Sequence, residues 1–455
     1  MKDVTTQQNL TRRQAIGCSL AAGVCFGAGP RSASVSDVVG AAEPQVRVRP
    51  WARHPAVKLP LLGFGCADRF PQKKGFGKHS VDYEAAGRLV DYAMSHGVNW
   101  FDTGYVYHKG ESERFLGKAL AKYPRESYLL TDKMPTWLVK KPEDGPRMFA
   151  EQLERCKVDY FDFYFLHSVG SKSVFEDVYV KMGVLDYLRS EKKKGRIRHL
   201  GLSFHGKSDF LAEVLDANPD LEACLVMLNR MEYEWNKDAA KLADVAAKRG
   251  VAVLVMEPLA GGRAANLRGQ SLAVLEKARP GDTAARWGLR FAASEPGVVC
   301  LFSGMNKLEH LKENIETLSE TFRPFDAQER KTYDEAIAVY MKHPSIPCTG
   351  CRYCDPCPYG VRIPELFAWY NEWAQAGRLP SENGANDSQD LRRRFLASYN
   401  NAFPPKTRAD RCLGCKKCLV SCPQWTFRIP VEMEKIANLV VQVEADYVRK
   451  GGTLR

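Results

Sequence analysis

A cysteine-rich tail constrains this chain more than any other feature. Its two runs, CTGCRYCDPCPYGVRIP at 348–364 and CLGCKKCLVSCPQWTFRIP at 412–430, hold eight of the fourteen cysteines. The second run has the spacing C-x2-C-x2-C-x3-C-P, in which three thiolates bind one 4Fe-4S cluster and the fourth binds the other cluster. The predicted ligands are Cys348, Cys351, Cys354, Cys357, Cys412, Cys415, Cys418 and Cys422.

The first run departs from this spacing, because only two residues separate Cys354 from Cys357. Its loop must be tighter, so whether it completes a second cluster stays open, whereas Cys412, Cys415 and Cys418 match the pattern closely. Zinc is the alternative, since paired cysteines are also its usual ligands. A crossed fourth cysteine before a proline in both runs favours iron and sulfur over zinc.

Two segments between the cysteine runs show apolar residues at helical spacing. They are PELFAWYNEWAQ at 364–375 and SQDLRRRFLASYN at 388–400. We expect helices to join the clusters. The tail therefore resembles the α-helical ferredoxin type of dicluster domain more than the compact β-hairpin type.

Residues 1–42 have the pattern of an export signal. Arg12 and Arg13 precede the weakly apolar run AIGCSLAAGVCFGAG, and Gly40-Ala41-Ala42 offers small residues for cleavage. The segment resembles a twin-arginine signal, although Ala15 stands where a bulkier apolar residue is commoner. The run is too short to span a membrane permanently. It predicts a periplasmic or other extracytoplasmic protein, with a cytoplasmic basic tail as the alternative.

The two ends of the chain support one another. Clusters are assembled in a reducing cytoplasm, whereas free thiols that were exported unfolded would oxidise or pair wrongly. An exporter of folded proteins, which twin-arginine signals address, meets this need.

The remaining composition is that of a globular protein, with 45% hydrophobic and 26% charged residues. The net charge of +12 is dispersed, and no helix-turn-helix or stacking-aromatic pattern accompanies it. We therefore expect no nucleic-acid partner, although anionic ligands are favoured. The basic run at 191–198 is interpreted as a solvated helix end.

From about 59 to 319 the chain alternates short apolar runs with helical segments. The predicted strands lie at 59–65, 99–102, 127–133, 161–167, 197–204, 223–229, 251–257 and 298–304, and predicted helices include 81–97, 111–123, 175–195, 237–250 and 306–318. Eight strand-then-helix units predict a (β/α)8 TIM barrel of the α/β class with its active site at the carboxyl ends of the strands. We assign residues 43–330 to the barrel and 331–455 to the mainly α-helical iron-sulfur domain.

Polar residues end six of these strands, which is an odd choice for stability alone. They are Asp102, Lys133, His167, Ser203, Glu257 and Ser303. At the carboxyl end of a barrel strand such residues indicate catalysis.

The stretch FDTGYVYHKGESERFLGKAL at 101–120 resembles the Asp-Thr-Ala-x-x-Tyr-Gly signature of aldo/keto reductases. The likeness runs over roughly 58 to 320, and the MEPLAGG stretch together with the tail resembles the iron-sulfur branch of that family. The family's catalytic Asp, Tyr, Lys and His fall on Asp102, Tyr107, Lys133 and His167, in its order and strand positions.

These four residue types suit the reduction of a carbonyl. A hydride builds negative charge on the oxygen, so a proton donor must be within hydrogen-bond reach. We expect Tyr107 to be that acid, with the Lys133 ammonium stabilising its phenolate and so pulling the pKa down from about 10. Asp102 would orient Lys133, and His167 would guide the carbonyl. The alternative is a buried ion pair beside an ordinary tyrosine and a core histidine.

The resemblance also implies a site for NADP or NAD extended over the barrel mouth. The family's cofactor-binding positions correspond here to Ser203, His205, Arg230, Met256, Pro258, Leu259, Gly261, Gly262, Ser303, Lys307, Glu313 and Asn314. Arg230 stands where many relatives have Gln, and Met256 where an aromatic ring stacks on the nicotinamide. Gly304-Met305 replaces the Lys-Ser pair that grips the 2'-phosphate, with Lys307 a substitute, so the choice between NAD and NADP stays open.

The sequence thus predicts an exported oxidoreductase that interconverts a small or sugar-like carbonyl and an alcohol by hydride transfer with NAD(P). Because a hydride carries two electrons and a 4Fe-4S cluster accepts one, the clusters are either structural or serve a redox partner. The alternative is a non-catalytic protein that binds dinucleotide, senses redox state or transfers electrons.

Overall fold

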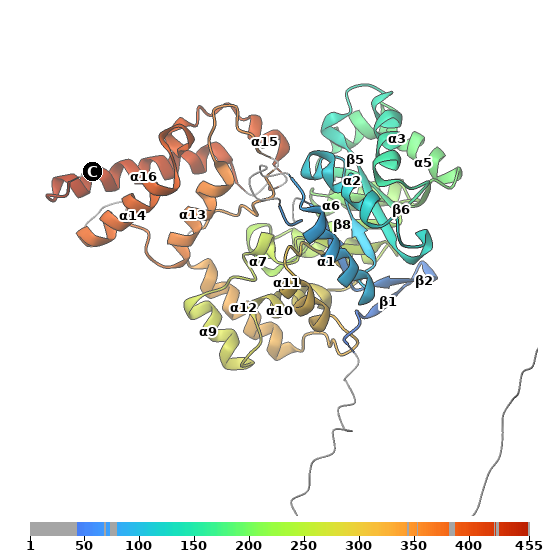
Figure 1. Ribbon diagram of the computed structural model, residues 1–455, viewed down its shortest axis with the longest axis horizontal. Coiled ribbons are helices and arrows are strands. Elements are labelled where there is room, and N and C mark those ends of the chain that lie inside the picture. The colour runs from blue at the N-terminus through green and yellow to red at the C-terminus, as the bar shows by residue number, and fades with distance from the viewer. Residues whose placement is uncertain are drawn as a thin grey trace, which may run out of the picture. The chain divides into compact units, whose positions relative to one another are not determined.

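The computed structural model describes residues 43–67, 70–72, 80–343, 345–352, 354–381, 387–422, 424 and 427–453. The predicted export signal at 1–42 lies outside the described residues. Within them, a closed parallel barrel is followed by a helical domain that carries the cysteines (Figure 1).

The eight predicted barrel strands are all confirmed. They are β3 (Leu62–Gly65), β4 (Trp100–Asp102), β5 (Leu129–Pro135), β6 (Phe161–Val169), β7 (Ile197–Phe204), β8 (Ala223–Met227), β9 (Ala252–Met256) and β10 (Val298–Ser303). Each pairs in parallel with the next, and β10 pairs with β3 to close the barrel. The six strand ends that carry a polar residue in the sequence analysis therefore lie at the same mouth of the barrel.

Helices follow the strands and cover the barrel. They are α1 (Tyr83–Ser95), α2 (Glu111–Ala119), α3 (Asp144–Cys156), α4 (Lys172–Val174), α5 (Val184–Lys193), α6 (Ser208–Ala217), α7 (Arg230–Trp235), α8 (Ala239–Ala247), α9 (Gly269–Ala278), α10 (Ala284–Ser294), α11 (Leu308–Thr317) and α12 (Ala327–Met341). The single helix predicted at 175–195 is wrong in detail. A π-helical turn at Phe175–Val180 and α5 are separated at Gly183, whose φ of 68° a helix cannot accommodate.

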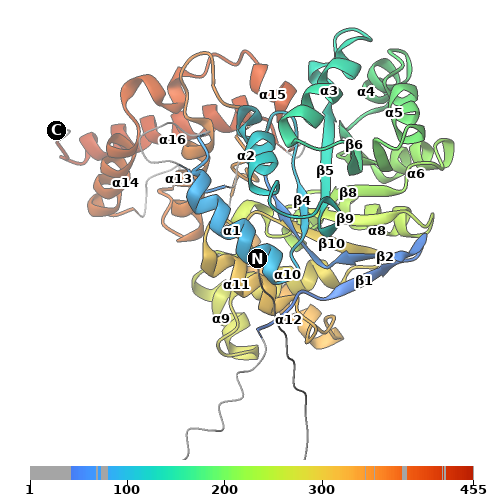
Figure 2. The ribbon, with the colours of Figure 1, turned by 45° about the vertical axis from the view of Figure 1, so that its right-hand side comes forward.

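A hairpin that was not predicted from the sequence closes the amino-terminal end of the barrel. Its strands β1 (Val48–Trp51) and β2 (His54–Pro60) lie beside β9 and β10 (Figure 2). Trp51 is 1% exposed and packs its ring 5.5 Å from that of Phe163, which in turn contacts Trp100. Large rings therefore fill the barrel interior from this side.

The tail is helical, as predicted, and has its own hydrophobic core. Its helices are α13 (Ile363–Gln375), α14 (Gln389–Ala402), α15 (Lys417–Ser421) and α16 (Ile429–Arg449). Rings of Trp369, Phe395 and Tyr399 pack between α13 and α14, and the cysteines border this core. By contrast, α12 packs against α9 and places Tyr333 and Ile337 in the barrel core, so the barrel's packing continues past residue 330.

The described helices were also compared with the dimensions of a bilayer. Among them, none combines the length and the apolar character that a membrane crossing requires.

Candidate functional site

A cavity of about 280 Å³ opens at the carboxyl ends of the barrel strands. Eleven of the residues predicted for catalysis or cofactor binding line it, and they come from the ends of five strands (β4, β6, β7, β9 and β10) and the loops beyond them. These are Asp102, Tyr107, His167, Ser203, His205, Met256, Pro258, Leu259, Gly261, Gly262 and Ser303. The topology thus brings together residues that are as much as 201 positions apart, from Asp102 to Ser303.

The floor of the cavity holds a buried ion pair. The Lys133 ammonium lies 2.7 and 2.8 Å from the two carboxylate oxygens of Asp102 and donates to the carbonyl oxygen of Thr103 over 2.6 Å. The Lys133 and Asp102 side chains are 1% and 6% exposed. Adjacent strands β4 and β5 place the two residues side by side, and the three acceptors hold the ammonium in one position.

The Tyr107 ring stands directly above this pair. The Lys133 Nζ atom lies 4.8 Å from the ring centroid, and the His167 ring approaches Tyr107 edge-on at 6.0 Å between centroids. Tyr107 is 5% exposed. The geometry therefore groups a phenol, an ammonium and an imidazole around one small space.

The loop after Tyr107 is unusual and fixes the tyrosine. His108 and Lys109 have φ values of 49° and 57°, a left-handed conformation that costs roughly 1–2 kcal/mol for each non-glycine residue. The fully buried His108 ring anchors the loop, since its Nε2 accepts a hydrogen bond of 3.3 Å from the Phe70 amide. Backbone strain of this kind typically persists at functional sites.

Burial shifts the pKa values of two site residues. It raises the pKa of the Asp102 carboxyl, an effect that the Lys133 ammonium opposes. It lowers the pKa of His167 well below 6.5, and the positive charges of Lys133 and His205 act in the same direction. His167 is therefore neutral at physiological pH, a form that can donate from one ring nitrogen and accept at the other.

Some predicted cofactor residues do not reach the cavity. Arg230, expected beside a nicotinamide, is not part of the lining: it opens α7 and forms ion pairs with Glu234 and with Asp334 of α12. Lys307 is exposed at the start of α11 and is not part of the lining. Glu313 accepts a hydrogen bond of 2.5 Å from Thr283 on the outer side of α11.

Asn314 lies behind the cavity wall and supports Ser303, which lines the cavity. It is 3% exposed, and its Nδ2 donates to the Ser303 hydroxyl over 3.1 Å. Trp137, a candidate wall from the sequence, lies 5.0 Å from His167 between ring centroids but outside the lining.

The sequence did not reveal the buried polar network behind β5. Gln152 donates to Asp132 over 2.5 Å and to the Lys133 carbonyl oxygen over 3.1 Å, while Tyr164 donates to Gln152 over 2.5 Å. The Asp132 pKa is raised by burial and by the nearby charge of Glu113. This network fixes β5, the strand that carries Lys133. The sequence feature that could have indicated it is Asp132, a polar residue within an apolar strand.

The eight cysteines fall into two groups that cross the two sequence runs. The Cys354 thiol has Cys351, Cys348 and Cys422 as its electrostatic neighbours. We call these four the proximal cysteine group. The Cys418 thiol has Cys412, Cys415 and Cys357 as neighbours, and these four form the distal cysteine group.

Both groups have the chemistry of an iron-sulfur site. Burial and the neighbouring sulfurs raise the pKa of the Cys354 thiol, and raise those of Cys418 and Cys422 to about 11. Thiolates gathered in one poorly solvated place need a cation among them to offset their mutual repulsion. A cavity of about 310 Å³ offers room at the distal group, whose four cysteines all line it together with Cys354, Ile363 and Pro430. The residues present therefore fit 4Fe-4S clusters.

The proximal cysteine group lies against the catalytic cavity. Cys351 is part of the cavity lining. A Cβ atom on Gly261 would lie 2.3 Å from the Thr349 carbonyl oxygen, so only glycine permits this approach, and its φ of 67° also favours glycine. In addition, Arg263 donates to the Ile346 carbonyl oxygen over 2.8 Å.

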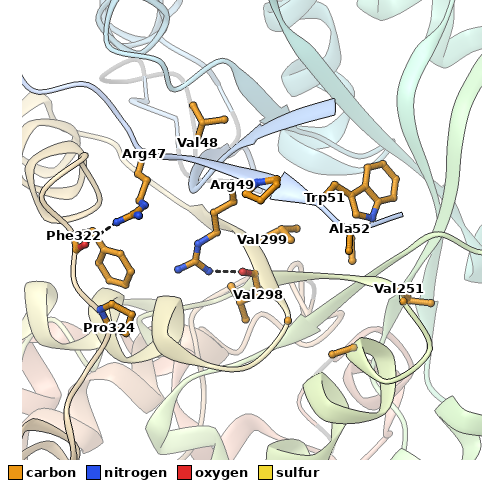
Figure 3. A pocket seen from close by; sticks show the side chains of 15 residues that line it. Arg47, Val48, Arg49, Trp51, Ala52, Val251, Val298, Val299, Phe322 and Pro324 are labelled. Atoms are coloured by element: carbon orange, nitrogen blue, oxygen red, sulfur yellow. Dashed lines mark hydrogen bonds between the residues drawn. The ribbon is translucent and has the colours of Figure 1, made fainter. Parts of the chain in front are cut away.

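A larger hollow of about 480 Å³ lies at the opposite end of the barrel beside β1 (Figure 3). Its two arginines already have partners, since Arg47 donates to the Phe322 carbonyl oxygen over 2.9 Å and Arg49 to those of Val298 and Ala293. Burial, aided by the charge of Arg47, lowers the pKa of Arg49 to about 10. The hollow gathers no catalytic group, so its arginines serve to fasten the hairpin.

Comparison with known families gives two matches along this chain. Residues 62–338 match the model described as the aldo/keto reductase family, and residues 347–428 match that of a 4Fe-4S dicluster domain. The L-galactose dehydrogenase of Arabidopsis thaliana is 26% identical over 306 residues, which are 63% of this chain and 93% of that protein. The NADH-specific methylglyoxal reductase of Escherichia coli is 25% identical over 287 residues, 53% of this chain and 85% of that protein.

Solved structures show the same barrel. An aldo-keto reductase from Bacillus halodurans in its holo form has a TM-score of 0.51 and 21% identity, covering 64% of this chain and 96% of its own. One from Klebsiella pneumoniae in complex with NADP and acetate has a TM-score of 0.50 and 20% identity, covering 64% and 95%. At these identities the likeness establishes the fold.

Proposed function

Because this chain belongs to the aldo/keto reductase family and carries a 4Fe-4S dicluster domain, it is an oxidoreductase of that type, and we propose that it interconverts a carbonyl and an alcohol by hydride transfer with NAD(P). One observation carries the proposal: Tyr107 stands at the barrel mouth with the Lys133 ammonium 4.8 Å from its ring. Two relatives are named for L-galactose and for methylglyoxal, and a cavity of about 280 Å³ suits a substrate of that size.

In the reducing direction the side chains divide the work. The dinucleotide, when bound, supplies the hydride to the carbonyl carbon. Tyr107 donates its hydroxyl proton to the carbonyl oxygen as negative charge develops there, and the ammonium of Lys133 favours the phenolate that remains. Asp102 and the Thr103 carbonyl oxygen keep that ammonium in place. The phenolate regains a proton from solvent.

His167 orients the substrate rather than acting as an acid. Its lowered pKa keeps the imidazole neutral, so it donates one hydrogen bond to the carbonyl oxygen without competing for the proton of Tyr107. Its position is fixed by β6, because Tyr179 donates to the His167 carbonyl oxygen over 2.9 Å.

The residues around the cavity fit an extended dinucleotide. The Ser203 hydroxyl and the His205 Nε2 atom, 3.3 Å apart, offer polar groups to the nicotinamide amide. The loop from Pro258 to Gly262 offers backbone groups to the pyrophosphate. Met256 supplies an apolar surface where relatives have a ring. The outward positions of Lys307 and Glu313 leave both NAD and NADP as candidates.

We further propose that the tail holds two clusters, one in each cysteine group. An external partner would exchange single electrons with the distal one, since a hydride cannot be passed to a one-electron acceptor directly. Exposed apolar side chains beside the distal group, Leu413 and Val420 at 69% and 77%, together with Lys416 and Lys417, provide a surface for such a partner.

Export would place this enzyme where little free dinucleotide is available. We therefore propose that the mature protein keeps a tightly held dinucleotide, which is oxidised and reduced within one catalytic cycle. The twin-arginine pattern at Arg12 and Arg13 supports export.

The test uses the mature holoprotein. It is denatured, and the supernatant is assayed for dinucleotide, iron and acid-labile sulfide; the intact protein is then supplied with methylglyoxal and other carbonyls under NADH or NADPH. Released dinucleotide and carbonyl-dependent turnover are the expected results. Absence of both bound dinucleotide and affinity for either cofactor would contradict the proposal.

Two features of the cavity wall favour a second function, that of a redox sensor. Met256 replaces the stacking ring, and Cys351 lies in the cavity wall, so the barrel could bind dinucleotide without turning it over while the clusters report the potential. Tight binding with no hydride transfer to any aldehyde would select this function, whereas turnover excludes it.

A further inference from the structure

Glu257 has a conformation that needs explaining. It follows β9 with a φ of 52°, a left-handed conformation that glutamate rarely adopts. Asn229 fixes its backbone by donating to the Glu257 carbonyl oxygen over 3.0 Å. The strain, of the order of 1–3 kcal/mol, indicates that the position of this carboxylate matters.

The Glu257 carboxylate joins the barrel to both arms of the proximal cysteine group. Thr349 Oγ1 donates to Glu257 Oε1 over 2.9 Å, and Gln424 Nε2 lies 3.4 Å from Glu257 Oε2. Thr349 directly follows Cys348, and Gln424 stands two residues after Cys422. Thr349 and Gln424 are 5% and 4% exposed, so these contacts are shielded from water.

The same residue faces the catalytic cavity. Glu257 belongs to its lining, together with Met227, whose sulfur lies 3.3 Å from Gln424 Nε2. One acidic side chain thus borders the space for the dinucleotide and the loops that carry Cys348 and Cys422.

We propose that Glu257 is a positioning residue that couples the cluster of the proximal cysteine group to dinucleotide binding in the catalytic cavity. The inference rests on the proposed function, since it concerns the same cavity. The coupling is electrostatic and structural, and no electron passes between the two groups. Because coupling is reciprocal, a dinucleotide whose affinity depends on the cluster's oxidation state must shift the cluster's midpoint potential in return.

The charge of Glu257 gives the direction of one effect. One-electron reduction adds a negative charge to the cluster, and a fixed carboxylate in a poorly solvated site opposes that addition. Removing the carboxylate charge should therefore favour the reduced cluster. The hydrogen bonds from Thr349 and Gln424 give a second, structural connection. A movement of either cysteine loop displaces Glu257, which lines the cavity.

The experiment is a mediated potentiometric titration of the mature holoprotein, followed by electron paramagnetic resonance, with and without saturating NADP⁺ or NAD⁺. In the unaltered protein, cluster reduction should change dinucleotide affinity roughly tenfold, which equals a shift of about 59 mV in the midpoint potential on binding. In Glu257→Gln the reduced-to-oxidised ratio at a fixed potential should rise roughly tenfold, and the shift on dinucleotide binding should fall to less than about a third.

Two further variants sharpen the result. Thr349→Val removes the hydroxyl donor but keeps the Glu257 charge, so it should weaken the coupling to dinucleotide more than it moves the potential. Glu365→Gln is the matched control, because Glu365 accepts from Arg352 over 3.2 Å, one residue from Cys351, but does not line the catalytic cavity. It should leave the coupling unchanged. Iron and sulfide contents equal to those of the unaltered protein confirm that each variant is folded.

The outcomes separate this inference from the proposed function. A Glu257→Gln protein with the original potential and the original coupling would overturn the inference, as would a dinucleotide that binds the unaltered protein without moving the potential. If no dinucleotide binds, the proposed function fails and the coupling fails with it, whereas a dinucleotide that binds without moving the potential overturns the coupling alone.

Discussion

The ion pair beneath Tyr107 gives a prediction whose size follows from its geometry. At 2.7 Å and an effective dielectric constant of about 20, the attraction between Lys133 and Asp102 is about 6 kcal/mol, most of which offsets the cost of burying both charges. Asp102→Asn leaves a buried ammonium with the Thr103 carbonyl oxygen as its remaining strong acceptor. Loss of one partner of a buried pair costs about 3–5 kcal/mol.

The assay is a double-mutant cycle on the holoprotein. Asp102→Asn and Lys133→Met should each lower the thermal midpoint by about 3–8 °C. The double variant should be less destabilised than the sum of the two, because it leaves no unpaired charge. Turnover should be lost in all three, since each removes the ammonium or its orientation.

Additive losses of stability in the double variant would refute this reasoning, because they would show that the two charges do not depend on each other. Retained turnover in Lys133→Met would refute its catalytic part.

Three further predictions concern other parts of the site. The pKa of His167 in the folded protein lies well below 6.5, so below pH 6 the unfolded chain binds a proton at this residue and the folded chain does not. The free energy of unfolding should therefore fall by about 1.4 kcal/mol for each pH unit as the pH is lowered below 6. The His167→Gln variant should lack this part of the pH dependence in urea titrations. Cys422→Ser should alter the paramagnetic signal that responds to Glu257→Gln, although Cys422 belongs to the second run; an effect confined to the other signal would contradict the crossed grouping. Gly261→Ala should destabilise by about 1–3 kcal/mol more than Gly183→Ala in urea denaturation, because both have a φ near 67° but only the first meets the Thr349 backbone; equal losses would contradict that close approach.

The barrel could be predicted because its strands are continuous apolar runs that alternate with helical segments, and six of the eight are ended by a polar residue. The hairpin β1–β2 could not, since its strands have only 4 and 7 residues, and neighbouring Pro55 and Ala56 are both exposed, which breaks the alternation. The break at Gly183 was hidden in a helical pattern, because glycine lowers helix stability without excluding it.

The catalytic set was accessible from sequence because Asp102, Lys133 and His167 close predicted strands and Tyr107 follows Asp102 in the next loop, and barrel topology places all these strand ends at one mouth. Side-chain direction was not accessible. Arg230 lies in a family cofactor position but pairs with Asp334, 104 residues away. Likewise, Glu257 was visible as a strand-end acid, yet its partners Thr349 and Gln424 are 92 and 167 residues away in the chain.

The central claim is that Tyr107 donates the proton as the carbonyl accepts a hydride. Its most direct test is Tyr107→Phe, followed by single-turnover oxidation of bound NADH or NADPH on addition of an aldehyde. We predict that cofactor affinity and iron content stay unchanged while the rate of hydride transfer falls by about two to four orders of magnitude. An unchanged rate would contradict the account.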